Sequence, residues 1–232
     1  MVATQKTNRR KYQAVVFDMD GVLLDTESQY MRAMQRTAAG LGFEITDQLL
    51  FGQIGRNASE SRRRLSAELG QDFPIDEFST LWPTTWKEMV AVEGITQKPG
   101  VREVLKLLRD KSLVHAIATS SIAEHAERSL ETAGLLSHFP IRVTGEQVVN
   151  SKPAPDIYLE AASRLGVPAA RCFAFEDSEP GLQAALAAGM TAFMIPDLLP
   201  ASAESRATAH GVLDSLHDAV AVLTNMLKRE LD

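Results

Sequence analysis

The chain has 232 residues, which suits one large domain or one domain that carries an insertion. Its 24 Lys and Arg against 30 Asp and Glu give a net charge of −6, which argues against binding to the phosphate backbone of nucleic acids. The single cysteine, Cys172, excludes an intrachain disulfide and a cysteine-based zinc site. The apolar runs are too short to cross a membrane, and the polar first residues do not resemble a secretory signal. We therefore expect a soluble cytoplasmic protein.

Short apolar runs alternate with helical periodicity along most of the chain. Runs that are apolar at odd and even positions alike predict strands that are buried on both faces. They lie at 14–17, 113–118, 141–143, 172–175 and 191–195. Apolar spacing predicts helices at 100–110, 122–133, 156–165, 181–188 and 214–227. Ser120 and Ser121 are expected to cap the helix that starts at 122. This alternation predicts an α/β fold with a Rossmann-like, doubly wound parallel sheet.

One segment after the first strand breaks the alternation. Residues 28–96 contain no convincing buried strand, and the spacing there predicts helices, including 59–69 and 78–90, with the last one interrupted at Pro83. We interpret residues 28–96 as an inserted all-α helical cap domain. Residues 1–27 and 97–232 then form the Rossmann-like core.

Polar side chains follow the carboxyl ends of the predicted strands. They are Asp18 and Asp20 after the first strand, Thr119 and Ser120 after the second, Lys152 in the loop after the third, and Glu176 and Asp177 after the fourth. Doubly wound sheets bind ligands at this edge, beside the point where the strand order reverses. We therefore expect these side chains to share one site.

The residue types at this edge indicate phosphoryl transfer. Clustered carboxylates repel one another unless a cation lies among them, and oxygen ligands suit Mg²⁺, with Asp177 and Glu176 completing its site. Asp18 can attack phosphorus and form an aspartyl-phosphate. Asp20 can protonate the leaving alcohol and then deprotonate the hydrolytic water. Lys152 can offset the charge on the transferred group, and Thr119 and Ser120 can donate hydrogen bonds to it.

Four stretches together resemble the motifs of the haloacid dehalogenase-like superfamily. They are AVVFDMDGVLLDTE at 14–27, ATSS at 118–121, SKPAPDIY at 151–158 and FEDSEPGLQAA at 175–185. The resemblance runs from about residue 13 to 195 and is strongest for the branch of sugar-phosphate phosphatases and β-phosphoglucomutase-like proteins. It implies that Asp18 is both nucleophile and metal ligand and that Asp20 also binds Mg²⁺ through its backbone carbonyl. It implies further that the cap closes over the site.

The resemblance also carries expectations about the substrate. Arg56, which follows Gly55, matches a position where relatives contact the far side of the substrate, and Lys98 lies at the hinge. The dehalogenase branch has no acid at the position of Asp20, so that residue argues against a dehalogenase. The phosphoglucomutase has a histidine twelve residues after the nucleophile, where this chain has Tyr30, which favours a hydrolase.

The sequence thus predicts a monomeric, Mg²⁺-dependent phosphohydrolase that acts on a small phosphorylated metabolite through an aspartyl-phosphate. A sugar or polyol phosphate is the expected substrate class. Two alternatives remain open: a β-phosphoglucomutase-like phosphomutase and a catalytically idle protein that binds a phosphorylated ligand.

Overall fold

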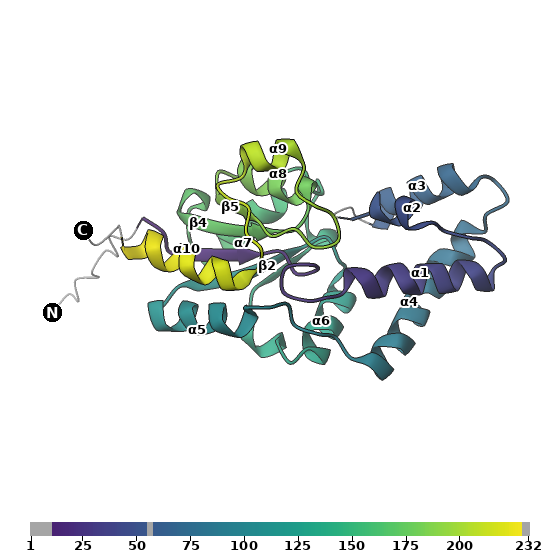
Figure 1. Cartoon of the computed structure of the whole chain (residues 1–232), viewed down its shortest axis with the longest axis horizontal. Coiled ribbons are helices and arrows are strands. Elements are labelled where there is room, and N and C mark those ends of the chain that lie inside the picture. Colours follow the sequence, from purple (N-terminus) through teal and green to yellow (C-terminus); the bar gives the residue numbers. More distant parts are fainter. Residues whose placement is uncertain (1–10, 55–57, 229–232) are drawn as a thin grey trace.

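The computed structural model describes residues 11–54 and 58–228. A five-stranded parallel sheet lies at its centre, with the strand order β3-β2-β1-β4-β5 (Figure 1). The strands are β1 (Ala14–Phe17), β2 (Val114–Thr119), β3 (Arg142–Thr144), β4 (Cys172–Glu176) and β5 (Thr191–Met194). The chain builds outward from β1 on one side and then returns to build on the other, so the strand order reverses beside β1. The predicted α/β fold with a doubly wound parallel sheet is confirmed.

The two faces of the sheet carry side chains of different size. On one face, the rings of Phe17, Phe175 and Phe193 stack in a row, with 5.6 Å between neighbouring centroids. The other face is lined by small residues such as Ala116 and Ala174, which let helices pack close to the backbone. The aromatic face is covered by α5 (Val101–Lys111), α6 (Ala123–Thr132) and α10 (Leu216–Lys228), and the alanine face by α7 (Asp156–Leu165) and α8 (Glu179–Ala187).

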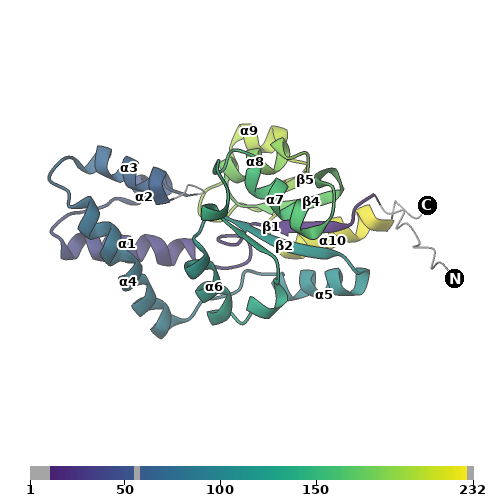
Figure 2. The ribbon, with the colours of Figure 1, turned by 180° about the vertical axis from the view of Figure 1, so that it is seen from behind.

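Four helices form a separate group at the end of the sheet where its strands terminate (Figures 1 and 2). They are α1 (Glu27–Gly40), α2 (Asp47–Phe51), α3 (Ala58–Leu69) and α4 (Ile75–Glu93), and we call them the helical segment. α1 packs along α4, and the segment has an apolar cluster of its own that includes Leu50, Leu65 and Phe78. This arrangement agrees with the helical content that the sequence predicts between residues 28 and 96.

Two local predictions are wrong. Helix α4 is not interrupted at Pro83 but runs unbroken through it, because its buried face of Phe78, Trp86 and Val90 holds it in place although one backbone donor is missing. Ser120 and Ser121 do not cap α6, whose N-cap is Ile122 without a side-chain cap bond. The Ser121 hydroxyl donates to Asp20 instead. The Ser121 side chain thus bonds to Asp20 and not to the N-terminus of α6.

Two short helices and three 3₁₀ turns of the described residues were absent from the expected pattern. α2 and α9 (Ala203–Thr208) are each too short to show a helical period, and both begin at a serine or threonine N-cap whose side chain accepts a backbone N–H. Single 3₁₀ turns connect other elements, at η1 (Leu136–His138), η2 (Gly145–Gln147) and η3 (Ala169–Arg171). Within residues 11–54 and 58–228, none of the helices has the length and apolar content that a membrane crossing requires.

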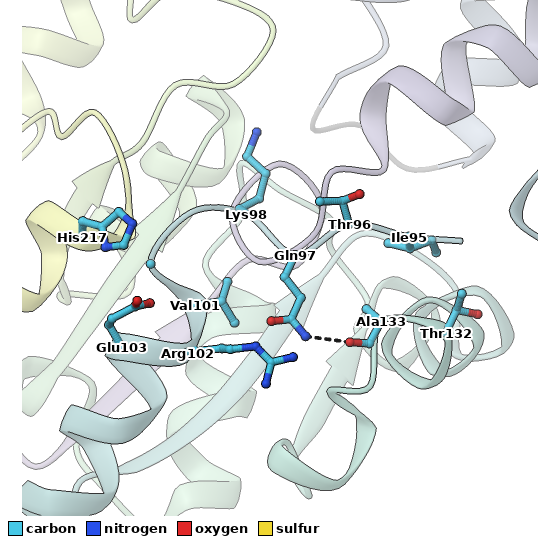
Figure 3. A pocket seen from close by; sticks show the side chains of 11 residues that line it. Ile95, Thr96, Gln97, Lys98, Val101, Arg102, Glu103, Thr132, Ala133 and His217 are labelled. Carbon is cyan, nitrogen blue, oxygen red and sulfur yellow. Dashed lines mark hydrogen bonds between the residues drawn. The ribbon is translucent and has the colours of Figure 1, made fainter. Parts of the chain in front are cut away.

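The chain enters and leaves the helical segment through two strips of backbone that bond to each other. The amide of Asp25 donates to the Thr96 carbonyl, and the amide of Lys98 donates to the Leu23 carbonyl, both at 2.9 Å. The Gln97 side chain then ties this ribbon to the core, because its Nε2 donates to the Ala133 carbonyl at 2.7 Å (Figure 3). Both crossings are therefore held at one place.

Replacing Leu108 with alanine tests the packing of the aromatic face. Leu108 is fully buried on α5, so Leu108→Ala is expected to lower the free energy of unfolding by about 2–5 kcal/mol through lost burial and a cavity. The matched control is Leu159→Ala on α7, where the side chain is 45% exposed and a change within about 0.5 kcal/mol is expected. Urea unfolding measures both, and equal losses would contradict this description of the core.

Candidate active site

The register of the sheet brings the ends of three strands to the same level. Phe17 at the end of β1 pairs with Ile117 on β2 and with Phe175 on β4. Asp18 is therefore level with Glu176, and Thr119 and Asp177 follow immediately. The side chains of these residues are all buried, with at most 7% of each residue exposed. Residues that are more than a hundred positions apart in sequence thus share one small volume.

Lys152 lies at the centre of this volume and is 4% exposed. Its ammonium donates to Asp18 Oδ1 at 2.5 Å, to Glu176 Oε1 at 2.6 Å and to the Ala118 carbonyl at 3.1 Å. Burial alone would lower the pKa of Lys152, but the carboxylates of Asp18 and Glu176 raise it above its usual value. The lysine therefore stays charged and holds both carboxylates in place.

Glu176 is fully buried and has partners on both of its oxygens. Oε1 accepts from Lys152 and from the Tyr158 hydroxyl at 2.6 Å, and Oε2 accepts from the Ser178 hydroxyl at 3.1 Å. Its carboxylate also packs against Gly181, where a Cβ atom would overlap it. Glu176 is thus oriented by the core, which suits a residue that fixes the position of Lys152.

Asp18, Glu176 and Asp177 each place a carboxylate oxygen within 4.8 Å of the other two. Burial and the charges of the neighbouring carboxylates raise the pKa of Asp18 and of Asp177, although Lys152 lowers both. Asp177 lies over Gly21, which has a φ of +79° and where a Cβ atom would collide with its carboxylate. Three converging buried oxygens against a single ammonium form a cluster that could hold a metal ion.

The carboxylate of Asp20 does not belong to this cluster. Its oxygens accept hydrogen bonds from three hydroxyl groups: Thr26 at 2.5 Å, Ser121 at 2.9 Å and Thr119 at 3.3 Å. Burial raises the pKa of Asp20, while these hydrogen bonds oppose the rise. A buried carboxyl group with a raised pKa can carry and release a proton. That Asp20 also binds a metal through its backbone carbonyl stays a prediction.

A cavity of about 820 Å³ opens above these residues, between the sheet and the helical segment. Asp18, Asp20, Thr119, Ser120 and Asp177 line its core side. The structure therefore places five of the predicted site residues around one space that is large enough for a small metabolite. Glu176 and Lys152 are not part of the described lining, but the Lys152 ammonium contacts both Asp18, which is, and Glu176.

Arg56 and Lys98 are the two residues outside the sheet edge that the sequence offered as substrate contacts. Arg56 lies outside the described residues, so its role stays a prediction. Lys98 is paired with Asp197 at 2.5 Å, and it is absent from the described lining of the cavity. Tyr30, in the place of the mutase histidine, does line the cavity.

The family of the chain follows from a comparison of its whole sequence with known families. The profile of haloacid dehalogenase-like hydrolases matches residues 12–189, which is well over half of the chain. This chain belongs to the haloacid dehalogenase-like hydrolase family. The four motifs of the sequence lie inside the matched region.

Relatives of this hydrolase act on small phosphorylated molecules, as their names state. A phosphorylated carbohydrates phosphatase of Thermotoga maritima is 34% identical over 91% of this chain and 90% of its own length. Hexitol phosphatase B of Escherichia coli is 31% identical over 81% of this chain and 85% of its own length. The structure of CbbY from Rhodobacter sphaeroides in complex with phosphate superposes with a TM-score of 0.75 at 27% identity, over 88% of this chain and 95% of CbbY.

Several residues of the hydrolase site were missed by the sequence analysis. Thr26, Ser121 and Tyr158 stand inside or beside the motifs, but only the fold shows that their hydroxyls serve Asp20 and Glu176. Glu27, the first residue of α1, also lines the cavity. Burial and the charges of Asp20 and other acids raise the pKa of Glu27 to about 8. Its position at the end of the first motif gave no sign of this.

Replacing Gly181 with alanine tests how tightly the buried charges are held. The new Cβ would overlap the Glu176 carboxylate, which must move and loosen Lys152, so Gly181→Ala is expected to lower the free energy of unfolding by about 3–5 kcal/mol. Gly40→Ala is the control, because nothing lies within 4 Å of a Cβ there and alanine favours the helix. Thermal unfolding of both variants checks this. A Gly181→Ala protein as stable as the Gly40→Ala protein would contradict it.

Proposed function

We propose that this hydrolase is a Mg²⁺-dependent phosphatase that acts on a small phosphorylated metabolite, of the sugar or polyol phosphate class, through an aspartyl-phosphate. The observation that carries the proposal is the position of Asp18. Its carboxylate is fixed at 2.5 Å from the Lys152 ammonium, belongs to the carboxylate cluster and lines the 820 Å³ cavity. The names of the relatives support this substrate class.

In the first step, a carboxylate oxygen of Asp18 attacks phosphorus, and the bond from phosphorus to the alcohol oxygen breaks. Asp20 gives its proton to that oxygen, so the product leaves as a neutral alcohol. The raised pKa of Asp20 suits it to hold this proton. Lys152 keeps Asp18 in place, and hydrogen bonds from the Thr119 and Ser120 side chains hold the phosphoryl oxygens.

In the second step, Asp20, now a carboxylate, removes a proton from water. The resulting hydroxide attacks the phosphorus of the aspartyl-phosphate and restores the Asp18 carboxylate, so that inorganic phosphate leaves. Asp18, Asp177 and Glu176, with the backbone carbonyl of Asp20, would hold Mg²⁺, which supplies positive charge that lowers the repulsion between Asp18 and the phosphate. The buried cluster of three carboxylates with one lysine fits this ion.

The helical segment completes the proposal. We take residues 28–96 as the cap domain and 1–27 with 97–232 as the core, with the cap closing over the bound substrate and excluding water. Arg56 would contact the far side of the substrate. We expect a cytoplasmic monomer without nucleic-acid or membrane partners.

The two alternatives make different demands on the same residues. A phosphomutase must keep water away from the phosphorylated enzyme, and this chain has Tyr30 where the mutase has a histidine. An idle binding protein needs no intact machinery, yet Asp18, Asp20, Lys152 and Asp177 are all present and brought together. Both considerations favour the hydrolase.

Asp18→Asn is expected to lower kcat by about 10³-fold or more, because the amide cannot act as the nucleophile. Release of inorganic phosphate from hexose, pentose and polyol phosphates with Mg²⁺ measures the loss. Asp72→Asn is the control, since Asp72 is exposed on the helical segment and should keep full activity. Full activity in Asp18→Asn would show that the nucleophile is another residue.

Asp20→Asn separates the two steps. An alkyl phosphate needs a proton on its leaving oxygen, whereas p-nitrophenolate leaves without one. The variant is expected to lose about 10²-fold or more in kcat on alkyl phosphates, yet to release a rapid burst of p-nitrophenolate before the slowed hydrolysis of the aspartyl-phosphate. Stopped-flow absorbance measures the burst. Equal slowing of the burst and of alkyl phosphate hydrolysis would count against Asp20 as the acid.

Mg²⁺ is expected to stabilise the protein more at higher pH. Carboxyl groups of the unfolded chain lose their protons near pH 4, whereas Glu27 keeps its proton up to about pH 8 and Asp18 and Asp177 also have raised pKa values. The folded metal-free protein thus binds more protons than the unfolded chain, so its stability falls as the pH rises between these values. Because Mg²⁺ replaces this missing positive charge, we expect it to raise the melting temperature by about 5 °C at about pH 8.

The same measurement at about pH 5 should show a smaller rise, because protons then compete with the metal. Differential scanning fluorimetry gives both values, with Na⁺ at matched ionic strength as the control. A rise that is equal at both pH values, or equally produced by Na⁺, would contradict the metal site. Removal of the metal by EDTA should stop phosphate release, and added Mg²⁺ should restore it.

A further inference from the structure

The cavity above Asp18 has a polar core side and a mixed side that the helical segment forms. The described lining of the mixed side holds apolar and hydroxyl-bearing residues, among them Met34, Leu50, Phe78, Ser59, Ser61 and Ser79. Such a surface suits the carbon chain of a sugar or polyol, on which hydroxyl groups alternate with C–H groups. Which hydroxyl group is recognised depends on the polar atoms of this side that are still free to bond.

One polar atom on the mixed side is buried and lacks a partner. Gln53 lies just after α2, is only 8% exposed and lines the cavity. Its Oε1 atom accepts no hydrogen bond from the described residues. A buried acceptor that is left unsatisfied is costly, so binding of a donor that reaches it from the cavity is favoured.

The turn that carries Gln53 holds its amide in place. The side-chain Nε2 donates to the Leu49 carbonyl at 2.9 Å, and the backbone N–H donates to the Leu50 carbonyl at 2.8 Å. Leu50 itself is fully buried in the apolar cluster of the helical segment. Because Nε2 is already bonded, Oε1 is the atom that remains for a ligand. Because the amide is already fixed, little freedom is lost when a ligand binds to it.

Other polar side chains on this side are already bonded to the protein. The Ser79 hydroxyl donates to the Ile75 carbonyl at 2.6 Å and accepts from Arg62 at 3.0 Å. Arg62 also forms an ion pair with Asp76. A ligand must compete with these bonds to reach Ser79 or Arg62, whereas Gln53 Oε1 gains a bond without losing one.

An oxygen that can only accept a hydrogen bond selects the group that meets it. It binds an O–H or N–H group, offers nothing to a methyl group and repels a carboxylate. Within the proposed phosphatase function, on which this step rests, the donor is a hydroxyl group of the sugar or polyol chain. We propose that Gln53 is a specificity-determining residue, whose Oε1 accepts a hydrogen bond from the hydroxyl group at the end of the substrate that lies away from Asp18.

The first test uses the full chain with Mg²⁺ and pairs of substrates that differ in one hydroxyl group. The substrates are polyol phosphates from glycerol 3-phosphate to hexitol 6-phosphate. Each is paired with an analogue in which the terminal hydroxymethyl group, at the end without phosphate, is a methyl group. We expect kcat/KM to fall about tenfold on loss of the hydroxyl group at the chain length that reaches Gln53. Equal hydrolysis of both compounds at every chain length would overturn the inference and leave the phosphatase function standing.

Gln53→Leu removes the acceptor and keeps the size of the side chain. It is expected to lower kcat/KM about tenfold, mainly through KM, for the polyol phosphate that shows the preference, and to leave the methyl analogue unchanged. Gln48→Leu is the matched control and should keep the preference, because Gln48 is exposed on α2 and is outside the described cavity lining. If Gln53→Leu does not fold, Gln53→Asn, whose amide is one carbon shorter, should lose the preference in the same way. Equal losses on both compounds would indicate a structural role and overturn the inference.

Binding without turnover distinguishes this inference from the proposed function. In the Asp18→Asn protein, calorimetric titration is expected to give a Kd about tenfold lower for the polyol phosphate than for its methyl analogue. The Asp18→Asn/Gln53→Leu protein should bind the two compounds equally. If no compound releases phosphate but this pattern is seen, the phosphatase function fails and the role of Gln53 stands. If the two compounds bind alike to the Asp18→Asn protein at every chain length, the role of Gln53 is overturned.

Discussion

The structure depends on one buried ammonium group. Lys152 lies between Asp18 and Glu176 at the end of the sheet and forms an ion pair with each of them, at 2.5 Å and 2.6 Å. A buried ion pair of this kind stabilises a fold only when its geometry is good and its remaining lone pairs are satisfied. Much of the surrounding architecture meets that condition. Tyr158 and Ser178 complete the shell of Glu176, and Gly181 leaves the room that its carboxylate needs.

The same ammonium leaves an excess of negative charge. One lysine faces Asp18, Glu176 and Asp177, and Asp20 and Glu27 stand nearby. The raised pKa values of these acids express the cost of gathering them away from water. The carboxylates of such a site repel one another, and a positive charge that enters the site lowers this repulsion. The electrostatics of the folded protein thus favour binding of a cation at the site of the proposed reaction.

The sequence predicted the parts of this design that repeat locally, and missed the parts that depend on distant contacts. Short runs that are apolar at odd and even positions alike predicted the strands. The motifs predicted the site residues Asp18, Asp20, Lys152 and Asp177, because each of them follows a strand or lies in the loop after one. The continuity of α4 through Pro83 could not be read from local rules, since tertiary packing decides it. Ser121 was expected at a helix cap because both uses place a serine after a strand, and only the position of Asp20 distinguishes them.

The cavity shows the same limit. Gln53 lies in a turn whose sequence matches no motif. Only the fold shows that its side-chain oxygen is buried without a hydrogen-bond donor. Tyr30 was read as a missing histidine, but in the fold it packs on Trp82 and Trp86 at the boundary between the helical segment and the core. The lining of the cavity thus comes from two parts of the chain that are distant in sequence, which a linear pattern does not show.

The paired strips of backbone at the base of the helical segment have a consequence for how such proteins diversify. Backbone hydrogen bonds join residues 23–25 to residues 96–98. The helices between them are therefore connected to the core in the way that the loop of a hairpin is connected to its two strands. The entropy of closing that loop grows only slowly with its length. Insertions, deletions or a whole exchange of the helices can then accumulate there while the sheet and its charged edge keep their geometry. One hydrolytic core can in this way be inherited unchanged by lineages that come to recognise unrelated molecules.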